Sequence, residues 1–210
     1  LVALARESSK TIDPDADPYD ILLDEYEPGM TRARLEPVLD ALRKRLVPMV
    51  QESTRKTASW PDSITRAVPD AKLWEVCHDV LETIGFDFTR GHLDRATHPG
   101  TTAVGFDDVR LALRTKDDDL AEAILTALHE GGHGLYDQGF AAKDRGTLLA
   151  QAPSMGLHEA QARLWENHVG RAQEFWTYFF PKMRTTLGDS VMGLDAETGV
   201  FMLLFLDLSW

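Results

Sequence analysis

Residues 117–139 read DDDLAEAILTALHEGGHGLYDQG, and this stretch has a strong helical pattern. The apolar residues that would share its inner side are Leu120, Ile124, Leu128 and Leu135. Their spacing of four and seven residues is typical of an amphipathic helix. The acidic run 117–119 suits a helix N-terminus, where the helix dipole favours negative charge. Since glycine commonly follows the last helical turn, Gly139 completes the prediction of a helix from about 117 to 139.

Within this predicted helix lies the motif HEGGH, residues 129–133. His129 and His133 are four residues apart, so their rings share one face and can converge on one metal ion. Glu130 points to a neighbouring face, from which a general base can reach a metal-bound water without being a ligand. A chance match in a chain of this composition has a probability of roughly 1%. The competing hypothesis is a pair of surface histidines on an ordinary helix.

The two central glycines of the motif favour the metal-site hypothesis. A glycine in a helix interior costs about 0.8–1 kcal/mol relative to alanine, and two adjacent glycines carry that cost twice. Gly131 and Gly132 therefore predict that another element, or a substrate, comes close to the helix at this point.

A catalytic zinc site needs a third protein ligand, which the motif does not supply. Tyr136 and Gly139 occupy the last two places of an extended HExxHxxGxxH pattern, so that class of peptidase is excluded. The third ligand is expected from a second helix, predicted to run from Pro153 to about Phe180. The candidates there are His158, Glu159 and Glu166, and spacing alone does not choose among them.

Carboxylates near the motif are also candidates for holding the metal-binding histidines in place. Glu159 and Glu166 are seven residues apart and share a helix face, so one could be a ligand while the other supports a histidine. Asp137, four residues after His133, is a further candidate for such support.

The remainder of the chain indicates a mainly α-helical fold. Helices are predicted over 31–52, with Pro37 and Pro48 breaking or kinking it near its ends, and over 69–84. The apolar face of the first is Leu35, Val38, Leu39, Leu42, Leu46 and Val50; that of the second is Leu73, Val76, Cys77, Val80, Leu81 and Ile84. Residues 85–114 lack a helical period and are predicted to form loops with a short hairpin.

Composition excludes several classes of function. The 22 basic and 34 acidic residues give a net charge of −12, which argues against a nucleic-acid partner. The longest apolar run, 200–206, is far shorter than the roughly 20 residues that cross a membrane. The single cysteine, Cys77, excludes an internal disulfide and a cysteine metal cluster, and it fits a reducing compartment, the cytoplasm.

Several stretches resemble the thermostable metallocarboxypeptidases of the carboxypeptidase Taq type. The resemblance rests on the stretches HEGGHGLYDQG (129–139), HEAQARLWEN (158–167), DPYDILLDEYEPGMT (17–31), GFDFTRGHLD (85–94), His98-Pro99 and Asp108-Val-Arg110. The sequence differs from the usual family pattern at Gly100 and Ala112, where the family has phenylalanine and threonine. The resemblance implies a helical, zincin-like peptidase fold, of which this chain holds a part.

The resemblance also implies roles for individual residues. It makes His129, His133 and Glu159 the metal ligands and Glu130 the catalytic glutamate. It implies substrate contacts at His98, Asp108 and Arg110, which lie in two further family motifs.

Two segments are expected on this basis. Residues 1–188 would be a partial metallocarboxypeptidase domain, truncated at both ends relative to the family, and 189–210 a divergent apolar tail. Later family motifs, including one with an arginine for the substrate carboxylate, do not occur in this sequence.

The function implied is release of C-terminal amino acids from peptides with a free C-terminus. The resemblance further implies Zn²⁺, with Co²⁺ tolerated, and a homodimer. Two alternatives remain open: a metal-binding remnant with impaired catalysis, and a helical interaction protein without metal. An endopeptidase has no support beyond the metal motif.

Overall fold

The computed structural model describes residues 1–55, 68–115 and 120–188. The predicted tail 189–210 and the acidic run 117–119 lie outside these ranges. By its internal contacts the chain divides into two compact units. One comprises Leu1–Thr57 with Ala152–Leu157, and the other comprises Ala58–Gln151 with His158–Trp210. The HEGGH motif, residues 129–133, belongs to the second unit.

The first unit is helical, with α1 (Val2–Ile12), α2 (Pro18–Tyr26) and α3 (Arg32–Arg55). Asp17 caps α2 by accepting a 2.8 Å hydrogen bond from the backbone N–H of Tyr19, and Pro18 occupies the first helical position. Of the break or kink expected at the prolines, a break is wrong, because α3 continues through both Pro37 and Pro48.

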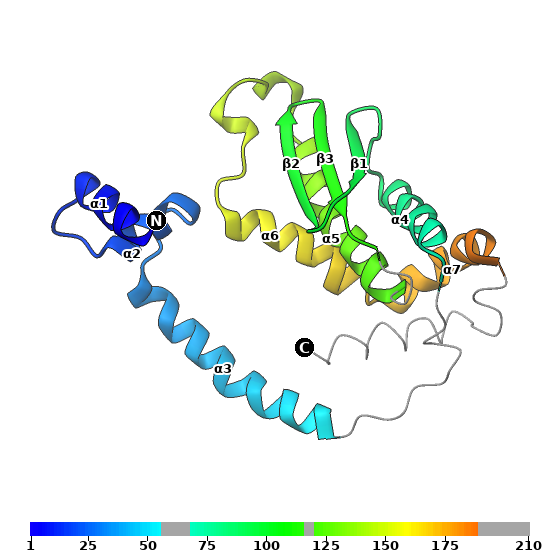
Figure 1. Cartoon of the computed structure of the whole chain (residues 1–210), viewed down its shortest axis with the longest axis horizontal. Helices are drawn as coiled ribbons and strands as arrows, with labels where there is room; N and C mark the ends of the chain where they lie inside the picture. The colour runs from blue at the N-terminus through cyan, green and yellow to red at the C-terminus, as the bar shows by residue number, and fades with distance from the viewer. Residues whose placement is uncertain (56–67, 116–119, 189–210) are drawn as a thin grey trace. The chain divides into compact units, whose positions relative to one another are not determined.

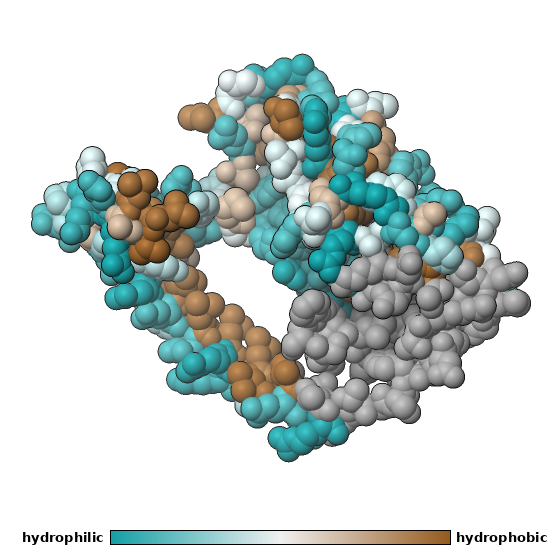
Figure 2. Space-filling view, in the orientation of Figure 1, coloured by the Kyte–Doolittle hydropathy of each residue, from teal (hydrophilic) through white to brown (hydrophobic). Residues whose placement is uncertain are grey.

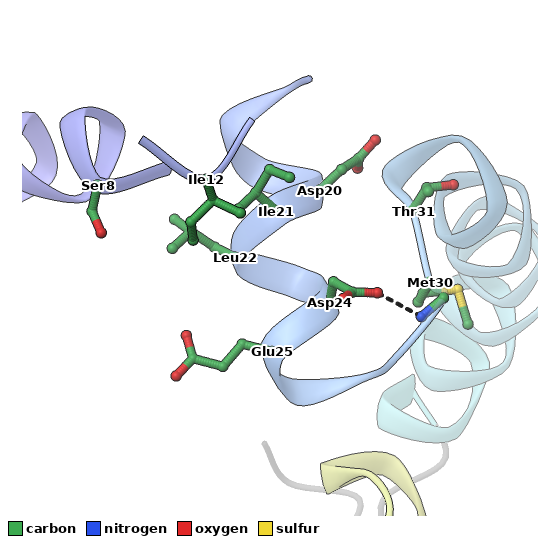
Figure 3. Close-up of a pocket in the computed structure, with 10 residues that line it drawn as sticks. Ser8, Ile12, Asp20, Ile21, Leu22, Asp24, Glu25, Met30 and Thr31 are labelled. Carbon is green, nitrogen blue, oxygen red and sulfur yellow. Dashed lines mark hydrogen bonds between the residues drawn. The ribbon is translucent and has the colours of Figure 1, made fainter. Parts of the chain in front are cut away.

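A hollow in this unit lies between α1, α2 and the turn that leads into α3 (Figure 3). Ile12, Ile21 and Leu22 give it an apolar wall. Two of its carboxylates are already used as backbone caps. Asp24 accepts a 2.7 Å hydrogen bond from Gly29 N, and Asp20 accepts a 2.6 Å bond from Arg32 N. These bonds fix the turn that leads into α3.

The apolar face predicted for α3 is formed but largely uncovered. Figure 2 shows it as a hydrophobic stripe along the helix. Its exposed members, between 40% and 55% accessible, are Val38, Leu39, Leu42, Leu46 and Val50.

The core of the second unit is built on α4 (Asp70–Ile84) and α5 (Leu120–Gln138). The predicted inner face of α4 is confirmed, since Leu73, Val76, Cys77, Val80 and Leu81 are completely buried. Gly85 ends α4 in the left-handed conformation, with φ of 92°, as its sequence position predicts. Helix α5 ends one residue before Gly139.

A three-stranded sheet covers α5 (Figure 1). Its strands are β1 (Gly91–Arg95), β2 (Gly100–Gly105) and β3 (Asp108–Leu113), in the order β1-β3-β2. The hairpin expected in 85–114 is β2–β3, an antiparallel pair in which Thr101 is opposite Leu111. Strand β1 was not predicted as part of a sheet. It pairs with β3 in parallel, a nonlocal contact without a turn signal in the sequence.

The single helix predicted from Pro153 to Phe180 is wrong. The structure has α6 (Met155–Arg163), a π-helical segment η3 (Leu164–Val169) and then α7 (Gln173–Leu187). The wide turn closes with a 2.7 Å hydrogen bond from Gly170 N to Trp165 O, five residues earlier. Trp176 Nε1 donates a 2.7 Å hydrogen bond to Gly170 O, and the Trp176 side chain is buried, so the start of α7 is anchored to the turn that precedes it.

Two short 3₁₀ helices, η1 (Ala142–Asp144) and η2 (Leu148–Ala150), lie between α5 and α6. Among the helices in the described ranges, none combines the length and the apolar character needed to cross a membrane.

Candidate metal centre

Three of the side chains singled out in the sequence meet between α5 and α6. His129 and His133 lie on α5 and Glu159 lies on α6, and one ligand atom from each falls within 4.8 Å of the others. Glu159 Oε2 is 3.3 Å from His133 Nε2 and 3.7 Å from His129 Nε2. Two imidazole nitrogens and one carboxylate oxygen are a donor set typical of catalytic zinc, which leaves a position for water or substrate.

The two glycines of the motif make this convergence possible. A methyl group at Gly132 would lie 2.8 Å from Ala162 Cα on α6, and one at Gly131 would lie 2.6 Å from Leu81 Cδ2 on α4. The prediction that another element comes close at this point is therefore confirmed. Helix α5 is flanked at the motif by α4 and α6. The close contact with α6 at Gly132 brings Glu159 to the histidines.

Glu166 holds the other side of the first histidine. Its Oε2 lies 2.7 Å from His129 Nδ1, so His129 Nε2 is the nitrogen that faces His133 and Glu159. The hydrogen bond to Glu166 raises the pKa of His129 despite its burial. Burial alone would raise the pKa of Glu166, but His129 and Arg163 together hold it below its ordinary value. An ionised carboxylate behind a ligand histidine is a common way to orient the ring.

Asp137 contacts a different histidine from the one that its spacing suggested. Its Oδ1 lies 3.3 Å from His158 Nε2, and the His158 ring stacks on His133 at a centroid distance of 4.4 Å. His133 Nδ1 is buried and makes no hydrogen bond within the described part of the chain. Burial lowers the pKa of His133 and so favours its neutral, metal-binding form.

Glu130 is nearly buried, with 6% of its surface exposed, and burial raises its pKa. Its Oε2 accepts a 2.7 Å hydrogen bond from Thr101 Oγ1 on strand β2. Sequence reasoning missed Thr101. The available signal was its position directly after the segment His98-Pro99-Gly100, which was itself singled out.

The residues expected to contact substrate lie on or before the sheet. Arg110 and Asp108 form a two-bond ion pair on β3, with distances of 2.9 and 2.8 Å, which lowers the pKa of Asp108. Arg110 is opposite Thr102, the neighbour of Thr101, while His98 lies exposed before β2. Within the described part of the chain, none of these three residues forms a hydrogen bond or an ion pair with a side chain of the HEGGH motif.

Comparison with known proteins gives consistent results. The model of the family described as carboxypeptidase Taq (M32) metallopeptidase matches residues 1–203. Carboxypeptidase 1 of Bacillus subtilis is 37% identical over 169 residues, or 80% of this chain. Thermostable carboxypeptidase 1 of Thermus thermophilus is 38% identical over 181 residues, or 84% of this chain. These matches span only 34% and 35% of the relatives' own lengths.

Solved structures give the same result. An M32 carboxypeptidase from Deinococcus radiodurans superposes with a TM-score of 0.87 at 34% identity. It covers 96% of this chain, whereas 40% of that protein is matched. Metallocarboxypeptidase 1 of Trypanosoma cruzi gives a TM-score of 0.79 at 28% identity, with 95% and 40% covered.

Proposed function

The chain belongs to the carboxypeptidase Taq (M32) metallopeptidase family, and from this premise we propose that it hydrolyses the last peptide bond of peptides with a free C-terminus. The observation that carries the proposal is the convergence of His129, His133 and Glu159 beside the buried carboxylate of Glu130. Because the chain spans about a third of the curated relatives' length, we propose this activity for the protein to which these residues belong.

In the proposed mechanism His129, His133 and Glu159 would hold a divalent ion. When bound, such an ion supplies Lewis-acid polarisation of the scissile carbonyl and lowers the pKa of the attacking water. Glu130 takes the proton of that water and passes it to the leaving amine nitrogen. Thr101 donates a hydrogen bond to Oε2 of Glu130. The other oxygen, Oε1, is therefore the one proposed to transfer the proton. The raised pKa of Glu130 suits a group that must both accept and release a proton near neutral pH.

Finer points belong to the same proposal. Zinc is the ion that two imidazoles and one carboxylate favour, with cobalt as a substitute. His98, Asp108 and Arg110 would contact the substrate, and the adjacency of β3 to β2, which carries Thr101, supports this.

A homodimer is proposed too, supported by the uncovered apolar face of α3 and tested by light scattering on the purified protein. The single cysteine supports a reducing cytoplasm.

Hydrolysis of an N-blocked dipeptide by the metal-loaded protein that contains these residues tests the proposal. We expect release of the C-terminal amino acid with zinc or cobalt. We also expect a Glu130→Gln variant to bind metal normally while turnover falls by about 10²–10⁴-fold. Absence of turnover by that protein, folded and metal-loaded, would instead support a metal-binding remnant without catalysis. Absence of metal binding would support an interaction protein.

A further inference from the structure

One guanidinium joins the two carboxylates that flank His129. Arg163, the last residue of α6, donates from Nε to Glu159 Oε1 at 2.8 Å. Its Nη1 donates to Glu166 Oε2 at 3.1 Å and to Oε1 at 3.3 Å. The same Glu166 Oε2 lies 2.7 Å from His129 Nδ1. A continuous chain of polar contacts therefore runs from Glu159 through Arg163 and Glu166 to His129.

The hydrogen bond from Arg163 gives the two oxygens of Glu159 different surroundings. Oε1 accepts from Arg163, while Oε2 faces His133 Nε2 at 3.3 Å and His129 Nε2 at 3.7 Å. We propose that Arg163 is a positioning residue for the metal site, because it restricts Glu159 to donation through Oε2 alone and holds Glu166 against His129. This inference rests on the proposed function, since it requires that these side chains bind an ion.

The side chain of Glu159 needs such a restraint. Its exposed fraction is 43%, so without a partner it would sample several rotamers in water. Glu166 is 12% exposed and is more closely confined. Ordering a rotamer-rich side chain before the ion arrives removes that cost from binding, which is the basis of preorganisation.

Arginine suits this position better than lysine does. Glu159 lies four residues before Arg163 and Glu166 three residues after it, so the two carboxylates approach the guanidinium from opposite sides along the helix. A planar fork with several fixed donors can bind both carboxylates at once, whereas an ammonium group acts as a point charge on a flexible stem.

The test compares zinc affinity in the wild type, Arg163→Lys and Arg163→Met, by competition with a chelating dye. We expect both variants to bind zinc about 10–100-fold more weakly. Arg43→Met is the matched control, because Arg43 forms an exposed ion pair with Asp40 on α3. A purely electrostatic role predicts the opposite sign for Arg163→Met, because removal of a positive charge should strengthen cation binding. Unchanged or tighter binding in the variants would overturn the proposal.

A second readout tests the single-oxygen donation of Glu159. The visible absorption of bound Co²⁺ responds to coordination number and geometry, so we expect it to change in both Arg163 variants and not in the Arg43 control. Weaker binding with an unchanged spectrum would also overturn the proposal, because it would indicate a general loss of stability. Unfolding temperatures of the metal-free proteins check this directly. If the wild type itself binds no metal, the proposed function fails. If the wild type binds zinc and both Arg163 variants bind it equally tightly, only this inference fails.

Discussion

Thr101 Oγ1 lies 2.7 Å from Glu130 Oε2 and donates a hydrogen bond to it, which joins the edge strand β2 to helix α5. The backbone carbonyl of the same glutamate lies 3.1 Å from the hydroxyl. Since Glu130 is nearly buried, few other groups can fix the orientation of its carboxylate. The sheet therefore positions the proposed general base.

Replacement of Thr101 by valine is expected to lower turnover about tenfold or more while zinc affinity is kept, because the carboxylate loses a defined orientation. Thr101→Ser retains the hydroxyl and should stay close to the wild type. Steady-state hydrolysis of a blocked dipeptide measures both. A valine variant as active as the serine variant would show that the hydrogen bond is dispensable.

The two glycines of the motif should differ in their tolerance of alanine. At Gly132 the new methyl group would meet the backbone of α6 at 2.8 Å, whereas at Gly131 it would meet the ends of Leu81 and Ile84. Gly132→Ala is expected to cost about 1–3 kcal/mol of unfolding free energy and to weaken zinc binding, because α6 must move away with Glu159. Gly131→Ala, which also gains helix propensity, is the control and should lose less. Chemical denaturation gives the unfolding free energy of both variants. Equal losses would show that the backbone of α6 does not limit the space at Gly132.

The pair of His129 and Glu166 makes a pH-dependent contribution to the stability of the metal-free protein. The hydrogen bond to Glu166 raises the pKa of His129 above its ordinary value of 6.5. The folded state therefore holds this proton more tightly than the unfolded state does. The resulting stabilisation is complete below pH 6.5 and is lost as the pH rises through the folded-state pKa. Thermal unfolding in a chelator should show the advantage of the wild type over His129→Gln shrinking as the pH increases; a growing advantage would reverse the assignment.

Cys77 should be inert in the native protein. The side chain is completely buried, its Sγ lies 3.5 Å from Ala123 O, and burial raises the pKa of its thiol to about 12. Thiolate is the reactive form, so alkylation by iodoacetamide at pH 8 should occur only after denaturant is added. Mass spectrometry gives the labelled fraction. Rapid labelling without denaturant would mean that the packing of α4 against α5 opens readily.

Metal binding should stabilise the fold by mass action. Zinc at 100 times its dissociation constant should add about 2.7 kcal/mol of unfolding free energy, and a chelator should remove that gain. His133→Ala should abolish the effect, whereas His92→Ala should keep it, because His92 is an exposed histidine on β1. Thermal unfolding with and without zinc gives the comparison. Equal stabilisation of the His133 variant would place the ion elsewhere.

Local periodicity alone was sufficient for several features. The spacing of apolar residues predicted α4 with its buried face and most of α5, because a helix repeats every 3.6 residues whatever surrounds it. The same regularity places His129 and His133 on one face, and the cost of adjacent glycines predicted the close approach of another element or a substrate. In each case the cause acts within a few residues of the chain.

Helical spacing did not decide which groups lie beside the two histidines; the family resemblance pointed to Glu159, and only the tertiary structure shows the arrangement. Spacing left His158, Glu159 and Glu166 equivalent, but the packing of α6 at Gly132 points Glu159 at both histidines and places Glu166 behind His129. Thr101 reaches Glu130 because β2 lies over α5. These distances depend on how helices and strands pack across long sequence separations, and helical or strand periodicity carries no information about such contacts.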